Sequence, residues 1–155
     1  MKGNEEIIDV LNGLLSDELT AINQYMVHAE MCENWGYERL HKKIEKHSID
    51  EMKHAEKLIA RILFLEGLPI VSNLKKIKIG SSVENQLKND WEAEEGAIKA
   101  YNEGISLATL SNDNGSLELM KANLLDEEGH IDWLEAQLEQ ISQIGIQNYL
   151  TDQIG

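Results

Sequence analysis

Apolar residues recur at three- and four-residue intervals in four separate stretches of the chain, a spacing that places them on one face of an α-helix. The first stripe is Leu11, Leu14, Leu15, Ile22, Tyr25 and Ala29, the second Leu40, Ile44, Leu58, Ile62 and Leu65, the third Val83, Leu87, Trp91, Ile98, Tyr101 and Ile105, and the fourth Leu117, Met120, Leu124, Ile131, Leu134, Leu138 and Ile141. Glycine-containing breaks separate them, near Gly36, Gly67, Gly80 and Gly115. The pattern predicts four long amphipathic helices, with a short fifth one from about residue 146, after Gly145.

The connections between these stretches predict how the helices are arranged. The first and third connections, around residues 34–36 and 112–115, are short, so each joins two antiparallel neighbours. The second runs from Gly67 to Ser82 and reaches roughly 50 Å if extended. A helix of about 30 residues is about 45 Å long, so this segment can cross the whole bundle. We therefore expect an all-α, ferritin-like four-helix bundle of two antiparallel hairpins joined by a long crossover.

Length and composition indicate a single domain. The 155 residues suffice for one substantial core but not for two ordinary ones, so we expect residues 1–155 to form one unit. No apolar run is long enough for a membrane span, nor does the chain carry a signal-peptide pattern, which predicts a cytoplasmic protein. The lone Cys32 cannot form an internal disulfide, and no C-x-x-C pair offers a thiolate metal site.

Acidic residues dominate the charged positions. The chain carries 28 acidic and 14 basic residues, which gives a net charge of -14. This excess argues against nucleic-acid binding, because basic side chains supply the affinity for phosphate backbones. Cations are the more natural partners, although acidity alone also keeps a soluble protein apart from its neighbours.

The two halves of the chain repeat each other at a distance of 76 residues. The stretches 49-IDEMKHAEK-57 and 125-LDEEGHIDW-133 share Asp, Glu, two spacers and His. The matched polar pairs are Glu18 and Glu94, Asp50 and Asp126, Glu51 and Glu127, and His54 and His130. Apolar matches arise easily among helices, so the polar matches carry the inference that both hairpins follow one plan.

The four repeated glutamates fall inside apolar stripes. Burying several unpaired carboxylates costs several kcal/mol each unless cations lie among them, and two divalent ions would balance four negative charges. A Glu and a His at i and i+3 share one helix face, and two such pairs plus one Glu from each remaining helix make a diiron carboxylate site. Carboxylates and imidazoles favour iron or manganese over structural zinc. A single Glu-x-x-His would more often be a solvated surface pair, but two copies in register favour the metal site.

Longer motifs add to this spacing, namely 21-AINQY-25, 48-SIDEMKHA-55, 61-RILFLEGLP-69, 126-DEEGHIDWLE-135 and 148-NYL-150. With them the chain resembles the bacterioferritin family over its entire length. The resemblance implies iron storage and detoxification by a ferroxidase that oxidises Fe(II) to Fe(III) with O2 or H2O2. It also implies that the mineral is stored in a 24-subunit shell built from two-fold dimers, and that a small ferredoxin serves iron release.

The resemblance implies the same six ligands that the spacing selects: Glu18, Glu51, His54, Glu94, Glu127 and His130. Glu51 and Glu127 would bridge two iron ions per subunit, and the other four would each ligate one ion. Tyr25, on the same stripe as Glu18, either supplies a further electron or hydrogen bond or is a packed core residue with its hydroxyl satisfied.

The resemblance further implies haem b, shared between two subunits and ligated by Met52 from each of them. Taken alone, Met52 would be a packing residue on an extra apolar side of the second helix, and two identical ligands require an isologous pair. Residues expected to line that pocket are Leu19, Ile22, Asn23 and Met26. Met26 and Glu45 depart from the family pattern, where an aromatic residue and Tyr are common.

A further departure concerns an accessory iron site on the inner surface. Lys46 stands where many bacterioferritins have a His that pairs with the Asp equivalent to Asp50. His47 and Asp50 are the remaining candidates for such a site. Alternatively, Asp50 and its repeat partner Asp126 support a metal ligand through a hydrogen bond.

Two other functions fit parts of the pattern. One is a diiron peroxide reductase of the rubrerythrin kind, although such proteins usually carry a cysteine-rich electron-delivery module that this chain lacks. The other is a haem-carrying structural subunit of a mixed shell, which the six intact ligands argue against.

Overall fold

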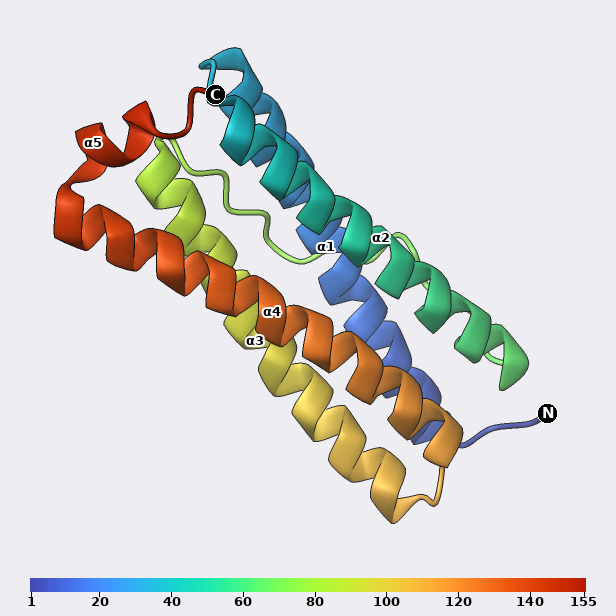
Figure 1. The fold of residues 1–155 in the computed structure, drawn as a ribbon. Helices are drawn as coiled ribbons and strands as arrows, with labels where there is room; N and C mark the ends of the chain where they lie inside the picture. The colour runs from blue at the N-terminus through green and yellow to red at the C-terminus, as the bar shows by residue number, and fades with distance from the viewer.

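Five α-helices and no strands make up the structure, a computed structural model that describes residues 1–155. The helices are α1 (Glu5–Asn34), α2 (Glu38–Phe64), α3 (Val83–Leu110), α4 (Asn114–Ile144) and α5 (Ile146–Thr151). Helices α1 and α2 form one hairpin and α3 and α4 the other, packed side by side (Figure 1). The predicted ferritin-like bundle with its short fifth helix is confirmed. None of the helices combines the length and the apolar character needed to cross a membrane.

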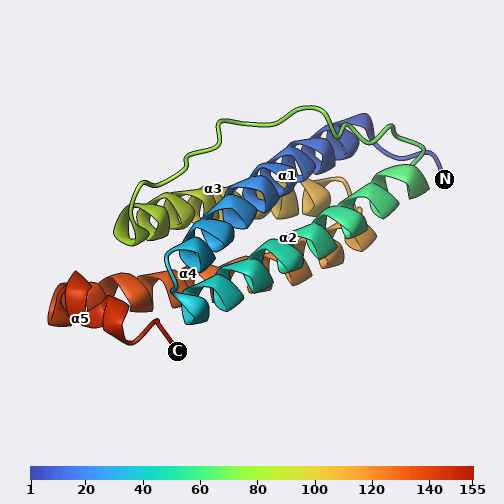
Figure 2. The same ribbon diagram turned by 90° about the horizontal axis from the view of Figure 1, so that it is seen from above.

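The crossover, residues 65–82, runs along the side of the bundle that α1 and α3 form (Figure 2). Its main chain is bonded to α1, since Lys78 N–H donates to Gln24 Oε1 at 3.0 Å and Gly80 N–H donates to His28 Nε2 at 3.0 Å. A side chain at Gly80 would meet the backbone nitrogen of Gln86 at 2.4 Å, so only glycine fits this close approach. His28 is therefore a structural residue that fixes the crossover.

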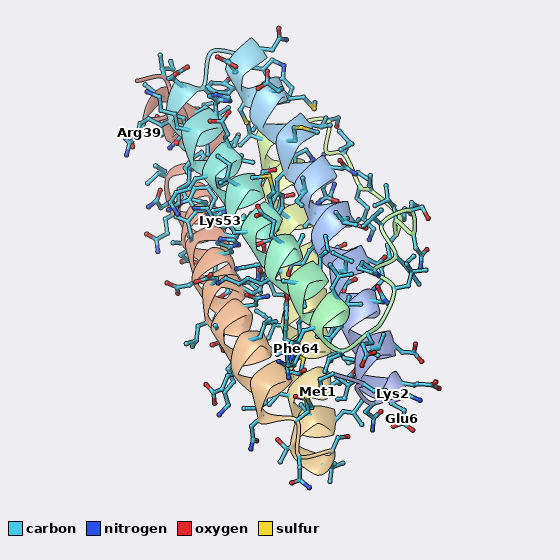
Figure 3. The ribbon with its side chains drawn as sticks, turned by 90° about the vertical axis from the view of Figure 1, so that its right-hand side faces the viewer. Met1, Lys2, Glu6, Arg39, Lys53 and Phe64 are labelled. Atoms are coloured by element: carbon cyan, nitrogen blue, oxygen red, sulfur yellow. The ribbon has the colours of Figure 1, made fainter.

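Side chains and the chain terminus hold the helix ends in place. Asn4 caps α1 and Asp113 caps α4, each accepting backbone N–H bonds of the first turn. The Met1 amino group donates to the Phe64 carbonyl at 3.0 Å. Figure 3 shows Met1 next to Phe64 at one end of α2, with Arg39 at the opposite end. The caps satisfy N–H groups at the helix starts, and the Met1 contact ties the chain terminus to the end of α2.

A polar layer separates two apolar clusters in the interior. The first cluster includes Leu11, Leu58 and Leu117, and the second includes Leu40 and Leu134. In each long helix one buried glutamate lies between the residues of the two clusters, and the four are Glu18, Glu51, Glu94 and Glu127. Apolar packing therefore shields this layer from water along the bundle axis, which makes every unpaired charge in it costly.

Candidate metal centre

The four long helices bring all six predicted ligands together inside the bundle. They are Glu18 of α1, Glu51 and His54 of α2, Glu94 of α3, and Glu127 and His130 of α4. Each residue is at most 5% exposed. The spacing of three residues places the Glu and the His of α2, and likewise those of α4, on one helix face, toward the interior.

Potential ligand atoms of these residues converge into two overlapping groups. One group is Glu18, Glu51, His54 and Glu127, and the other is Glu51, Glu94, Glu127 and His130; in each, one ligand atom per residue lies within 4.8 Å of the others. Glu51 and Glu127 belong to both groups. The arrangement thus offers two adjacent metal positions that share two carboxylates, with oxygen and imidazole donors that suit iron or manganese.

Each imidazole of the cage is oriented by an aspartate from the other hairpin. His54 Nε2 lies 2.8 Å from an Asp126 carboxylate oxygen, and His130 Nε2 lies 3.0 Å from an Asp50 oxygen. These contacts leave Nδ1 of both rings facing the glutamates, as the close approaches of Nδ1 to Glu127 and to Glu51 show. A carboxylate on the second nitrogen fixes the tautomer and the ring orientation of a histidine ligand. The geometry therefore supports the alternative in which Asp50 and Asp126 each orient a histidine ligand through a hydrogen bond.

Two buried tyrosines follow the same crosswise pattern. The Tyr25 hydroxyl donates a short hydrogen bond to Glu94, and the Tyr101 hydroxyl donates to Glu18 at 2.6 Å. Tyr101 also accepts a bond from the Asn123 amide at 3.1 Å. The sequence prediction named only Tyr25 for the site. The signal that identifies Tyr101 is its position exactly one repeat, 76 residues, after Tyr25.

Several buried atoms of the cage lack a hydrogen-bond partner. Seven such side-chain atoms occur in the protein, and six of them belong to the cage: Glu18 Oε2, Glu51 Oε1, His54 Nδ1, Glu94 Oε2 and both carboxylate oxygens of Glu127. His54 Nδ1 and Glu127 Oε1 are 2.8 Å apart, an ionic approach without the alignment of a hydrogen bond. Native proteins rarely leave buried polar atoms unpaired, and each exception requires an explanation. A pair of divalent cations among these atoms would satisfy them and offset the negative charge, so the residues present fit a two-metal site.

Burial and mutual repulsion make the metal-free cage retain protons. Desolvation raises the pKa of Glu51 well above its usual value, and the neighbouring Glu18 and Glu127 add to this rise. The pKa of Glu127 is raised for the same main reason. Burial alone would lower the pKa of His54, but its close contacts with Glu127 and Glu18 outweigh that effect and raise the pKa to about 11. Divalent cations would displace these protons when they bind.

A cavity of about 300 Å³ connects the carboxylates with the space beneath the crossover, between α1 and α3. Small residues line its walls, namely Ala21, Ala93, Gly96, Ala97 and Ala100. At its mouth Lys75 pairs with Asp17, and Lys78 pairs with Glu92 at 2.9 Å. The missing bulk between the two helices leaves room for small ions and molecules to reach the cage.

Comparisons with known proteins agree with this geometry. Residues 8–144 match the ferritin-like domain family. The chain is 42% identical to a bacterioferritin of Brucella melitensis and 41% identical to one of Rhodobacter capsulatus, in both cases over 96% of this chain and 92% of the relative. It is 42% identical to a bacterioferritin of Streptomyces coelicolor over 97% of this chain and 90% of the relative.

The chain belongs to the bacterioferritin family. The resemblance seen in the sequence motifs is thereby confirmed. This membership supports a role in iron storage, and the buried groups of carboxylates and imidazoles are compatible with a diiron site.

Met52, the haem ligand that the bacterioferritin resemblance implies, lies on the surface of α2 and is 47% exposed. Ile49 on the same helix is 41% exposed, and Met26 on α1 is 51% exposed. These large apolar side chains of α1 and α2 are uncovered, and Met52 lies about 100° round α2 from the buried Glu51. Exposed apolar surface of this kind is typical of protein or ligand contacts.

Lys46, His47 and Asp50, the residues considered for an accessory iron site, do not form a common group. Lys46 extends outward and pairs with Asp50 at 3.2 Å, and the same aspartate bonds His130. His47 is buried, at 4% exposure, and burial together with the nearby His130 lowers its pKa to about 3. His47 belongs to neither group of converging ligand atoms.

The raised pKa of Glu51 yields a testable stability effect. A carboxyl group whose pKa rises on folding binds its proton more tightly in the folded state, so the free energy of unfolding falls as the pH rises above about 4.3, the unfolded value. We expect Glu51→Gln to raise the melting temperature of the metal-free protein, by an amount that grows from about pH 5 to about pH 8. Circular dichroism in the presence of a chelator measures it.

Glu56→Gln is the matched control, because Glu56 lies on the same helix and is exposed. It should leave the melting temperature nearly unchanged at every pH. A Glu51→Gln variant that is less stable than the wild type at neutral pH, or whose advantage shrinks as the pH rises, would contradict the account of the buried charges.

Proposed function

We propose that the protein is a ferroxidase, with its diiron site inside a single domain of residues 1–155, and that it oxidises Fe(II) to Fe(III) with O2 or H2O2. The observation that carries this proposal is the pair of overlapping ligand groups that share Glu51 and Glu127. Glu18 and His54 would complete one iron position, and Glu94 and His130 the other. Four carboxylates then face two divalent ions, so the charges balance in the buried interior.

The two Fe(II) ions are substrates as well as occupants of the cage. Each gives up one electron, and the pair together supplies the two electrons that reduce O2 to H2O2 or H2O2 to water. Tyr25 is within reach of this chemistry, because its hydroxyl bonds the Glu94 carboxylate. We propose that it stabilises that ligand and that it supplies a further electron where O2 is reduced beyond H2O2, which takes more than the two electrons of the iron pair. The small-residue cavity beneath the crossover is a route by which Fe(II) and the oxidant reach the cage.

We propose that the chain assembles into a hollow homo-oligomer of 24 subunits that stores the ferric mineral in the cytoplasm, with two-fold dimers as the building unit. The uncovered apolar side chains of α1 and α2 support such pairing, because a self-complementary patch forms an isologous contact. Met52 from each partner would then ligate one shared haem b. A small ferredoxin that reduces the store through this haem is the partner that the family relationship suggests.

Two other functions can be distinguished from this proposal. A rubrerythrin-like peroxide reductase would use the same cage but would remain a small oligomer, which size-exclusion chromatography separates from a large shell. A haem-carrying structural subunit would need no ligands, whereas six buried ligand side chains with unpaired atoms favour an active centre.

Glu127→Ala should abolish rapid iron oxidation, because it removes a ligand shared by both metal positions. We expect the wild type to take up two Fe(II) ions per chain in an anaerobic titration and the variant to oxidise iron about 10- to 100-fold more slowly, or slower still, once O2 is added, because loss of mere support for a ligand already has an effect of that size. Glu128→Ala, which changes the exposed neighbour on the same helix, should behave like the wild type. A wild type without two-ion uptake, or a Glu127→Ala variant with an unchanged rate, would contradict the ferroxidase proposal.

Met52→Leu should remove haem while it preserves assembly, since leucine keeps the apolar volume and lacks the thioether sulfur. The absorption spectrum of the purified protein, normalised to protein concentration, measures haem occupancy. Met31→Leu is a matched change on α1, where Met31 sulfur instead accepts a weak bond from Gln86. Haem binding that survives in Met52→Leu, or haem-free protein in every variant and in the wild type, would contradict the proposed haem site.

A further inference from the structure

His47 is a buried histidine that the proposed chemistry does not use, yet it touches a residue of the cage. Its ring stacks on the His130 ring, with centroids 4.1 Å apart and planes 23° from parallel. The Trp133 ring also meets it edge-on, with centroids 5.1 Å apart and an interplanar angle of 87°. The His47 ring is therefore held in place and stacks against one of the two imidazole ligands.

The other half of the repeat has no such stacked ring. The position 76 residues after His47 is Asn123, whose amide is bonded to the Tyr101 hydroxyl at 3.1 Å. The aromatic ring nearest to His54 is that of His130, 6.5 Å away between centroids. The two metal positions, which are alike in their ligands, therefore differ in what holds those ligands.

The two aspartates that bond the imidazoles also differ in exposure, and this difference again favours a firmer hold on His130. The Asp50 side chain, which bonds His130, is 21% exposed, whereas the Asp126 side chain, which bonds His54, is 57% exposed. Water competes more strongly for an exposed carboxylate, so the contact from Asp126 restrains its ring less. A hydrogen bond at one ring nitrogen also leaves an imidazole free to swing about that bond, and a stacked ring prevents this motion.

We propose that His47 is a positioning residue that fixes the His130 ring, so that the Glu94–His130 position binds its metal ion more tightly than the Glu18–His54 position. The inference rests on the proposed diiron site and adds a functional difference between its halves. His47 acts through its ring face, since it belongs to neither group of converging ligand atoms. The tighter position would fill first when metal is scarce, and the weaker one would exchange its ion more readily.

Titration of the metal-free protein with Co(II), followed by visible absorption, tests this inference without any turnover. We expect the wild type to bind two Co(II) ions per chain with unequal affinities. His47→Ala should weaken the tighter position by about 10-fold or more, the usual effect of removing support from a metal ligand. His47→Phe keeps a stacking ring but no nitrogen and should stay close to the wild type. Asn123→Ala is the matched change in the other repeat and should leave the tighter position unaltered.

Ligand-deleted backgrounds assign the effect to one position. His54→Ala leaves the Glu94–His130 position intact, and adding His47→Ala to it should weaken the remaining Co(II) binding by about 10-fold. His130→Ala leaves the Glu18–His54 position, where the same addition should change the affinity little. Far-UV circular dichroism of each variant checks that the helices are retained, and only folded variants enter the comparison.

The outcomes separate this inference from the proposed function. A wild type that binds fewer than two Co(II) ions per chain would overturn the diiron proposal itself. A wild type that binds two, together with His47→Ala of equal affinity, would overturn only the role of His47. Equal losses in His47→Phe and His47→Ala would also overturn it, because they would assign the effect to the imidazole nitrogens instead of the stacked ring.

Discussion

Four carboxylates buried in the middle of a helical bundle are the constraint on which the rest of this structure depends. Apolar clusters lie on both sides along the bundle, so solvent reaches the charges only through the cavity beneath the crossover, and their unpaired oxygens face one another. Without cations, the protein meets this cost by holding protons on Glu51, Glu127 and His54, whose pKa values are all raised. The buried carboxylates therefore lower the stability of the metal-free protein, and bound cations would restore it. Residues needed for function often reduce stability in this way.

The repeated sequence explains how the cage is kept in shape. Each Asp-Glu-x-x-His copy contributes a shared glutamate and an imidazole, and its aspartate orients the imidazole of the other copy. The tyrosines cross between hairpins in the same way. Neither hairpin can therefore complete a site alone, and the crossover that holds the hairpins together, fixed by Gly80 and His28, is part of what makes the centre. The copies differ at Met52 and His47, which stand opposite Glu128 and Asn123 in the repeat, and we propose separate roles for the two halves at these positions.

Much of this was predictable from the sequence, because helical periodicity and a polar repeat are both local patterns. The helices, their hairpins and the convergence of six side chains followed from spacing alone. The crosswise partners did not, since whether Asp126 reaches His54 depends on how the two hairpins are rotated against each other. The stacking of His47 on His130 depends on the same rotation. The repeat relates Tyr101 to Tyr25. Its place on an apolar stripe fits a packed core residue equally well, so the sequence did not assign it to the site.

The measurement that tests the central claim most directly is anomalous X-ray scattering at the iron edge from a crystal soaked anaerobically with Fe(II). The account predicts two iron peaks per chain, about 3.5–4 Å apart, within the cage and flanked by Glu51 and Glu127. Strong peaks only at the group formed by the exposed Glu30 and Glu33 with His41, and no density between the buried carboxylates, would contradict it.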